Sequence, residues 1–250
     1  MSRKVVRLTL DHLDELTAPC RSCVFWQLDP VRRGRVEEAN GDGADEVDAW
    51  VSAVLRDWGS CGRVVLVDGH PKGFALYAPE AFLPGAGAFA TAPVSADAVL
   101  LTHLYVAPDA RRGGLGRMLV QGMAKDLMER GGIKAVEAFG DTRGDPGWDS
   151  TAHAWKGSPR DHARGSRCVA SVEFLGSVGF KTHRPHARNP RMRMDLRSAL
   201  SWREEVEAAL EKLIGVVRPA PKPTTERPTR SMGRGALRQR LRPRGTPRAR

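Results

Sequence analysis

The sequence contains no long apolar run. No stretch of its 250 residues approaches the roughly 18 to 20 apolar residues that a membrane-spanning helix needs. The opening residues, MSRKVVR, include no apolar segment of the kind found in secretory signals, so we expect no export signal. With 41% hydrophobic residues, the chain can still bury a core. The sequence therefore predicts a globular cytoplasmic protein without membrane contact and disfavours a wholly disordered chain.

Cysteines are also scarce, at positions Cys20, Cys23, Cys61 and Cys168. So few thiols exclude a small secreted domain framed by disulfides. The two-residue gap between Cys20 and Cys23 is typical of a zinc knuckle or a redox pair. The second pair that would complete a zinc knuckle is missing, because Cys61 and Cys168 stand alone. Packed thiols are the favoured interpretation and we predict no metal site, with zinc and redox chemistry kept as alternatives.

Basic charge is concentrated at one end of the chain. Residues 218–250 hold eleven Lys or Arg and one acid, whereas residues 1–217 hold 29 basic and 28 acidic groups. By its bulk charge the body is not a nucleic-acid-binding domain. The Arg- and Pro-rich tail is predicted to be disordered and to offer a possible contact to nucleic acid, although no aromatic residue is present for base stacking. An excess of 32 Arg over 8 Lys also fits GC-rich codon usage, as in actinobacteria.

The strongest pattern is a strand, a glycine-rich turn, a helix and a second strand. Residues 99–106 form an apolar run that ends at Pro108, which predicts a buried strand. An apolar stripe over residues 115–130 ends at two glycines, as expected for a helix. Residues 133–139 form the next strand. Because a helix connects the two strands, we expect them to be parallel neighbours.

Weaker patterns account for the other segments. A helix is predicted over residues 45–58, a hairpin over 63–78, a loop over 79–95 and a surface excursion over 141–167. The shorter predicted elements are a strand at 5–10, a helix at 169–178, a strand at 192–196 and a helix that starts at Ser201. Residues 11–43 show no clear pattern.

The turn at residues 111–117, Arg-Arg-Gly-Gly-Leu-Gly-Arg, combines bare backbone with positive charge. Glycines let a ligand approach closely, and the first N–H groups of a helix have no partner within the helix. The helix dipole and the arginines add positive charge, which predicts an anion cradle suited to a pyrophosphate. The turn is not a P-loop, because no Lys-Ser/Thr follows the glycines. It is not a dinucleotide fingerprint either, because Leu119 stands where Gly or Ala is needed.

The whole segment resembles the acetyl-CoA motif of the GNAT superfamily of N-acetyltransferases. The family pattern of Val-x-Pro, then Arg, then spaced glycines is matched here by Val106, Pro108, Arg111, Gly114 and Gly116. A second family signature, an aromatic pair followed by Gly-Phe, is similar to residues 174–180 except at Leu175. The order of the predicted elements also fits the family over residues 60–197.

The resemblance implies an α/β fold with a mixed, central, splayed β-sheet flanked by helices, in a GNAT-like domain over residues 1–217 with a separate tail at 218–250. It implies acetyl-CoA as the cosubstrate and direct attack of an amine acceptor on the thioester. The implied cofactor-binding residues lie at the end of the motif strand and in the cradle: Tyr105, Val106, Arg111, Arg112, Gly113, Gly114, Leu115, Gly116 and Arg117.

The sequence departs from the family at the groups that handle protons. Family members often carry an acid on the motif strand, where this chain has Thr102 and His103, and a Tyr where it has Leu175. Glu137 is a substitute base if its strand partly buries it, against the alternative of a solvent-facing residue. His103 is a candidate proton relay or a structural histidine, and Tyr105 a candidate donor to the thiolate or a packing residue.

Three functions follow from these observations. The leading hypothesis is an acetyl-CoA-dependent N-acetyltransferase acting on a primary amine of a small molecule or a protein. The missing acid and Tyr motivate the alternative of a non-catalytic acyl-CoA-binding module. A third hypothesis is a GNAT-fold protein whose basic tail binds nucleic acid.

Overall fold

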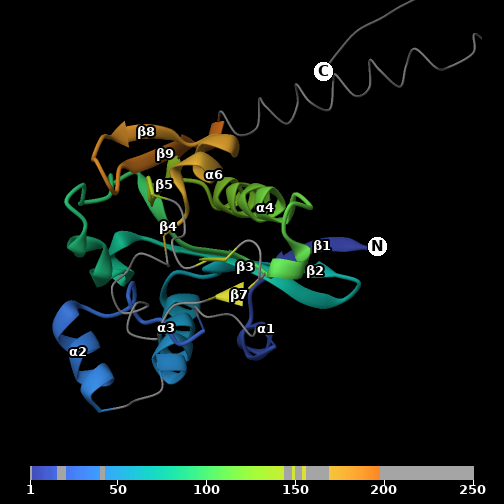
Figure 1. Cartoon of the computed structure of the whole chain (residues 1–250), viewed down its shortest axis with the longest axis horizontal. Helices are drawn as coiled ribbons and strands as arrows, with labels where there is room; N and C mark the ends of the chain where they lie inside the picture. The colour runs from blue at the N-terminus through green and yellow to red at the C-terminus, as the bar shows by residue number, and fades with distance from the viewer. Residues whose placement is uncertain are drawn as a thin grey trace, which may run out of the picture. The chain divides into compact units, whose positions relative to one another are not determined.

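The computed structural model describes residues 2–15, 21–39, 43–143, 148–149, 154–155 and 169–197 (Figure 1). The strands are β1 (Arg3–Arg7), β2 (Gly62–Val67), β3 (His70–Ala78), β4 (Ala98–Val106), β5 (Ala135–Phe139), β6 (Trp148–Asp149), β7 (Ala154–Trp155), β8 (Lys181–Arg184) and β9 (Arg191–Asp195). The α-helices are α1 (Leu10–Asp14), α2 (Pro30–Glu38), α3 (Gly43–Asp57), α4 (Leu115–Arg130) and α6 (Val172–Ser177). Short 3₁₀ turns occupy Glu80–Phe82, Pro84–Ala88 and Pro108–Ala110.

Seven strands form one mixed sheet in the order β1-β2-β3-β4-β5-β9-β8, and β6 pairs with β7 separately. All neighbours in the large sheet are antiparallel except β4 and β5, which run parallel as predicted. Residues of α1 and α3 pack on one face, and residues of α4 and α6 pack on the other (Figure 1). The predicted α/β fold, a mixed sheet flanked by helices, is confirmed. Among the described helices, none has the length and apolar character needed to cross a membrane.

The chain divides into a unit of Met1–Ala208 and a unit of Ala209–Arg250. The second unit, the helix predicted from Ser201 and the tail predicted at 218–250 lie outside the described residues. The proposed division at residue 217 therefore stays a prediction.

The N-terminal region differs from the sequence prediction. The strand expected at residues 5–10 ends at Arg7, because Thr9 starts α1 and its N–H donates to Nδ1 of His12 at 3.2 Å. Helix α2 was not predicted, although its start carries a recognisable signal. Oδ1 of Asp29 accepts hydrogen bonds from the N–H groups at the first turn, at 2.9 and 3.0 Å, and Pro30 takes the first helical position.

Strand β4 is paired along its two edges to very different extents. It pairs with β3 from Leu100 to Val106, with a bulge near Thr102. It pairs with β5 at only three positions, the last joining Leu100 to Glu137. Strand β5 continues to Phe139 as a partner of β9. The two parallel strands therefore part beyond Leu100, and the gap between them opens toward their carboxyl ends, which confirms the splayed sheet.

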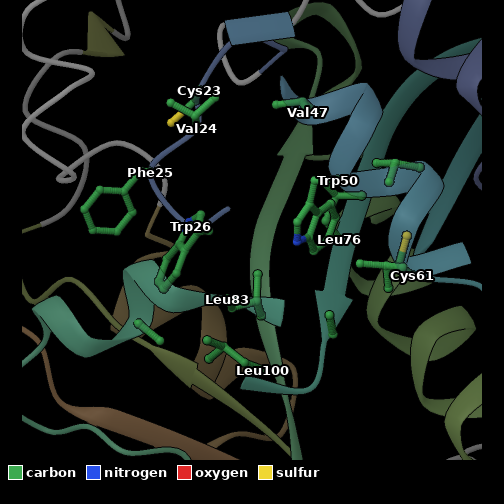
Figure 2. Close-up of a cluster of buried hydrophobic side chains, with 14 of the residues drawn as sticks. Cys23, Val24, Phe25, Trp26, Val47, Trp50, Cys61, Leu76, Leu83 and Leu100 are labelled. Atoms are coloured by element: carbon green, nitrogen blue, oxygen red, sulfur yellow. The ribbon is translucent and has the colours of Figure 1, made fainter. Parts of the chain in front are cut away.

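The core on the α1 and α3 face closes over the end of β5. Trp26 is only 1% exposed and lies in Figure 2 close to Leu83 and Leu100. Its ring stacks on Phe89 with a centroid distance of 5.2 Å, and Phe89 stacks on Phe139 of β5 at 4.2 Å. This aromatic stack joins a segment that has no clear sequence pattern to the wall of the gap.

Helix α4 is fixed to the opposite face by a buried carboxylate. Asp126, 3% exposed, accepts a hydrogen bond from the hydroxyl of Tyr77 at 2.8 Å and pairs with Nη2 of Arg130 at 2.7 Å. It also forms a salt bridge with the buried Arg63 of β2. Burial raises the pKa of Tyr77, so its hydroxyl stays protonated and able to donate. The network ties α4 to the second and third strands.

We predict that Asp126→Asn lowers the free energy of unfolding by about 3 kcal/mol, because it leaves the buried Arg63 without its counter-charge. The loss is measured by urea denaturation followed by circular dichroism. Glu129→Gln on the same helix is the control, since Glu129 is exposed and its pair with Lys125 is worth at most about 0.5 kcal/mol. Equal losses in the two variants would contradict the assignment.

Candidate functional site

The turn between β4 and α4 has an unusual backbone. Arg112 has a φ of 62° and Gly114 a φ of 79°, whereas Gly113 between them is not in the left-handed region. Such alternation turns successive N–H groups toward one concavity, the geometry of an anion-binding nest. A Cβ placed on Gly114 would meet no atom within 4 Å, so the space above this residue is open. Glycine is favoured here by its φ and leaves room for a ligand.

The N–H groups of this turn are available to a ligand. The first helical hydrogen bond of α4 runs from the N–H of Met118 to the carbonyl of Gly114 at 3.1 Å. Within the described part of the chain, no backbone hydrogen bond uses the N–H groups of Arg112 to Gly116. The 16-residue helix behind them adds its dipole. The turn thus presents a row of N–H donors that no carbonyl of the described residues accepts, as the predicted cradle requires.

Three side chains hold the turn in shape. Nη1 of Arg3, on β1, donates to the carbonyl of Gly113 at 2.7 Å. Nε of Arg111 donates to the carbonyl of Val106 at 2.9 Å. Nζ of Lys72 binds Asp109 at 2.7 Å, and this hydrogen bond holds the pKa of the Asp109 carboxyl below its usual value. Arginine side chains thus occupy the carbonyls of Val106 and Gly113, whereas the N–H groups of residues 112–116 have no backbone partner among the described residues.

Strand β1 reaches the turn because α4 lies directly against it. A Cβ on Gly122 would come within 2.7 Å of the Val5 side chain, so only glycine permits this close approach. Arg3 is two residues from Val5 and shares its side of the strand. The contact at Gly122 therefore places the Arg3 guanidinium beside the first turn of α4.

The second family signature, at residues 174–180, packs against the glycine-rich turn at Gly116. A Cβ on Gly116 would lie 3.0 Å from the Phe174 ring of α6, so this glycine is required for packing. Ser171 caps α6 by accepting a hydrogen bond from the N–H of Phe174 at 3.2 Å. Nη2 of Arg117 donates to the carbonyl of Ser177 at 3.0 Å and so points toward α6. The two sequence motifs form one corner of the molecule.

Two aromatic side chains of β4 lie beyond the point where β5 departs. His103 and Tyr105 both lie against Phe74, with centroid distances of 6.4 and 5.8 Å, so they share a face as expected. His103 is 2% exposed. Its Nδ1 lies 3.1 Å from the hydroxyl of Thr102, whereas its Nε2 is buried without a hydrogen-bond partner. An unsatisfied imidazole nitrogen in this part of β4 is a candidate proton acceptor.

The model of the Acetyltransferase (GNAT) family matches residues 23–146, which include the glycine turn and both strands of the gap. The chain belongs to the GNAT acetyltransferase family. No curated protein matches the sequence.

Solved structures resemble the GNAT domain at low sequence identity. The PaiA N-acetyltransferase of Thermoplasma acidophilum, solved with coenzyme A, is 14% identical, with coverage of 78% of this chain and 99% of its own and a TM-score of 0.47. An N-acetyltransferase of Staphylococcus aureus is 14% identical, with coverage of 78% and 99% and a TM-score of 0.46. The loading GNATL domain of CurA from Lyngbya majuscula is 12% identical, with coverage of 79% and 100% and a TM-score of 0.47.

Glu137 lies in neither of the two environments expected from the sequence, a partly buried strand position or a solvent-facing one. It is 0% exposed, so the interpretation as a solvent-facing residue is wrong. Its carboxylate lies 3.2 Å from Nε of Arg191 and 3.2 Å from Nη1 of Arg193, and it accepts a hydrogen bond from the N–H of Ser95 at 3.2 Å. Arg193 also binds Asp97 and lowers the pKa of that carboxyl. The oxygens of Glu137 are therefore engaged with two guanidinium groups of β9 rather than directed into the gap as free acceptors.

The cysteines show no metal centre in the part of the chain that the structure covers. No group of three or more His, Cys, Asp or Glu side chains there is arranged to hold a metal ion. Cys23 and Cys61 are buried, and burial raises the pKa of the Cys61 thiol to about 12. Cys61 is therefore a neutral packed thiol at physiological pH. Cys20 and Cys168 lie outside the described residues, as does most of the predicted excursion at 141–167.

Sequence reasoning missed three residues that shape the site. Arg3 is 110 positions from the carbonyl it binds, and no local pattern indicates that contact. Phe174 was read only as part of a signature, and its tight contact with Gly116 depends on the meeting of two helices. Arg191 becomes the partner of Glu137 only because β9 lies next to β5.

Proposed function

We propose that this GNAT domain is an acetyl-CoA-dependent N-acetyltransferase that acetylates a primary amine. The observation that carries the proposal is the row of N–H groups from Arg112 to Gly116, which have no backbone partner among the described residues and lie beneath open space at Gly114. Several donors directed at one concavity match the oxygens of a diphosphate. The exposed Arg112 adds full positive charge at the same place.

The residues around the gap fit the rest of the ligand. Beyond Leu100, the edge of β4 that faces the gap is left by β5, so the main chain along this edge is suited to bind the amides of the pantetheine arm. The cradle and this edge are consecutive in the chain, so one extended molecule contacts both. Acetyl-CoA would supply the thioester carbonyl, whose carbon bonds to the amine nitrogen as the carbon–sulfur bond breaks.

His103 is the proposed proton acceptor for the attacking amine. Its Nε2 has no partner, and the hydroxyl of Thr102 fixes the ring through Nδ1. Tyr105, on the same face, is the proposed donor to the departing thiolate. Glu137 is assigned a positioning role, since its carboxylate binds Arg191 and Arg193 and braces β5 against β9. The protein thus contributes orientation and proton transfer without a covalent intermediate.

One observation favours the alternative of an acyl-CoA-binding module without turnover. Leu175 replaces the Tyr often found in the family and is completely buried in the core. No general acid can act from that position. The two candidates share the cradle and differ only in whether an amine is acetylated. Binding of nucleic acid by the tail stays a prediction, because residues 218–250 lie outside the described part of the chain.

We predict that Gly114→Val abolishes the thermal stabilisation of the protein by acetyl-CoA. Valine disfavours the left-handed φ of 79° and fills the open space above the N–H groups. The measurement is the shift in unfolding temperature on addition of acetyl-CoA. Gly131→Val is the matched control, since Gly131 has a φ of 71° and open space at the other end of the same helix. An undiminished shift for Gly114→Val would refute the cradle.

Arg3→Ala should weaken acetyl-CoA binding about five- to tenfold while leaving the fold intact. The variant removes the charged hydrogen bond to the carbonyl of Gly113, a type worth roughly 1.5–3 kcal/mol when fully formed and less when exposed. Isothermal titration calorimetry gives the dissociation constant. Arg7→Ala on the same strand removes an exposed arginine away from the turn and should leave binding unchanged. Equal affinities for all three proteins would remove Arg3 from the site.

His103→Asn should lower kcat by about 100-fold or more, the usual contribution of a general base, without changing the thermal shift by acetyl-CoA. Release of free thiol in the presence of an amine panel reports the rate. His70→Asn, at an exposed histidine that begins β3, is the control. A kcat within about threefold of the parent would show that His103 is a structural histidine.

A further inference from the structure

The β8–β9 hairpin is the most one-sidedly charged segment of the described chain. Residues 181–194 contain five Lys or Arg and two His, and no acid occurs between Glu173 and Asp195. Residues 181–188 are all exposed. Residues 1–217 as a whole are nearly neutral, so the excess of positive charge in this segment is local.

The register of the hairpin places cations opposite cations. Lys181 lies directly across from Arg193, and Arg184 directly across from Arg191. Like charges at opposite positions of an antiparallel pair are destabilising. Glu137 and Asp97 bind the two arginines of β9, whereas no carboxylate among the described residues lies within 4.0 Å of Lys181 or Arg184. The cost of this arrangement falls if an anionic partner binds the outer strand.

Several cations elsewhere in the domain have a carboxylate partner. Arg56, Lys72 and Lys125 each have a carboxylate partner, at 2.9, 2.7 and 3.8 Å respectively. Arg188 at the turn of the hairpin resembles Lys181 and Arg184, since it has no such partner within the described residues. The β8–β9 hairpin thus carries three cations without a carboxylate partner among the described residues, and we call it the basic hairpin.

The turn of the basic hairpin lies beside the open end of the gap. Its turn is tied to the segment that follows β5, because Nδ2 of Asn189 donates to the carbonyl of Gly140 at 3.0 Å and the hydroxyl of Thr142 donates to the carbonyl of Ala187 at 2.8 Å. The gap between β4 and β5 opens toward this end of β5. A ligand that contacts the turn of the basic hairpin is thus close to the place where the amine must enter.

Strand β8 is also the last strand of the sheet, and its outer edge pairs with no other described strand. A free edge of this kind accepts an extended chain through backbone hydrogen bonds. Lys181 and Arg184 repel the same strand of a second copy, whereas they attract an acidic strand. The four residues of β8 span about 13 Å, the length of a short peptide segment.

The cavity at this strand fits a side chain better than a free small molecule. It has a volume of about 170 Å³ and is lined by Gly179, Lys181, Thr182, His183, Arg193 and Asp195. Sites for small molecules usually measure about 300–1,000 Å³. Residues 181–194 contain no Phe, Tyr or Trp, the large aromatic side chains on which bases of a nucleic acid stack best.

We propose that the basic hairpin docks an acidic polypeptide segment, and that this polypeptide carries the amine acceptor. Only the second part of this proposal, that the docked polypeptide carries the acceptor, rests on the proposed acetyltransferase function. An extended acidic segment pairs with the edge of β8, its carboxylates offset the charges of Lys181, Arg184 and Arg188, and one of its side chains enters the cavity. Docking raises the local concentration of the amine at the gap.

The test compares two fluorescent peptides with the full-length protein, without acetyl-CoA. One peptide is rich in Asp and Glu, and the other carries Asn and Gln at the same positions. We expect the acidic peptide to bind at least about tenfold more tightly at low salt and to lose most of this advantage at high salt, where charges are screened. The double variant R184E/R188E should lose the advantage.

The matched control is K4E/R7E, which makes the same change in charge at β1, the opposite edge of the sheet. It should bind the acidic peptide as the parent does. Equal loss in both double variants would show a bulk charge effect and overturn the proposal. Equal affinity for the two peptides, or tighter binding of a single-stranded oligonucleotide that R184E/R188E abolishes, would also overturn it.

A second arm addresses the acceptor. With acetyl-CoA present, mass spectrometry of the peptide amines should show faster acetylation of the acidic peptide by the parent and by K4E/R7E than by R184E/R188E. The thermal shift by acetyl-CoA should be the same in all three proteins. Docking without acetylation in any of them would contradict the transferase assignment while leaving the docking surface established, so the two failures are distinguishable.

Discussion

The structure depends on strand β4, whose backbone separates from its hydrogen-bonded neighbour β5 partway along its length. Strand β4 is paired along one edge to Val106 but along the other only to Leu100. Peptide groups at such an edge and in the turn that follows need partners, and unpaired buried or ligand-facing N–H groups are costly to leave empty. The parting of β4 from β5 and the nest at residues 112–116 are therefore two parts of one continuous stretch of main chain, which the proposed function assigns to an extended polar ligand.

A gap of this kind persists only if its walls cannot close, and two buried carboxylates keep them in place. Asp126 binds Arg63 and Arg130 and fixes α4 to the β2 and β3 side of the sheet. Glu137 binds Arg191 and Arg193 and fixes β5 to β9 on the far side of the gap. Each acid sits between two guanidinium groups, so removal of either acid leaves buried positive charge. The two clusters serve the site by holding the strands that border it, although neither touches the cradle.

Local sequence patterns were sufficient for the elements whose cause is local. The strand, glycine turn and helix around Gly114 follow from an apolar run, a proline and a glycine cluster, and the parallel pairing follows from the connection between them. The environment of Glu137 could not be inferred, because its partners come from β9, more than 50 residues away. The burial of Trp26 could not be inferred either, since its stack with Phe89 and Phe139 joins three segments that lie far apart in the sequence. Patterns along the chain predict elements, whereas burial and ion pairing depend on which elements meet.

The same distinction applies to charge. The near-neutral total of residues 1–217 suggested no class of acceptor, yet the fold separates that charge in space. Acids of β5 and the loop before β4 bind the inner arginines of β9, and the outer cations of β8 are left unpaired among the described residues. Positive charge consequently borders the gap on both sides, at the cradle beside β4 and at the basic hairpin beyond β5. The electrostatic fields of the cradle and the basic hairpin add within a low-dielectric gap, so both attract anionic ligands toward it. Under the two proposals, a diphosphate at the cradle and an acidic acceptor at the basic hairpin would each meet positive charge, so the local distribution of charge, rather than the net charge, would select the substrate.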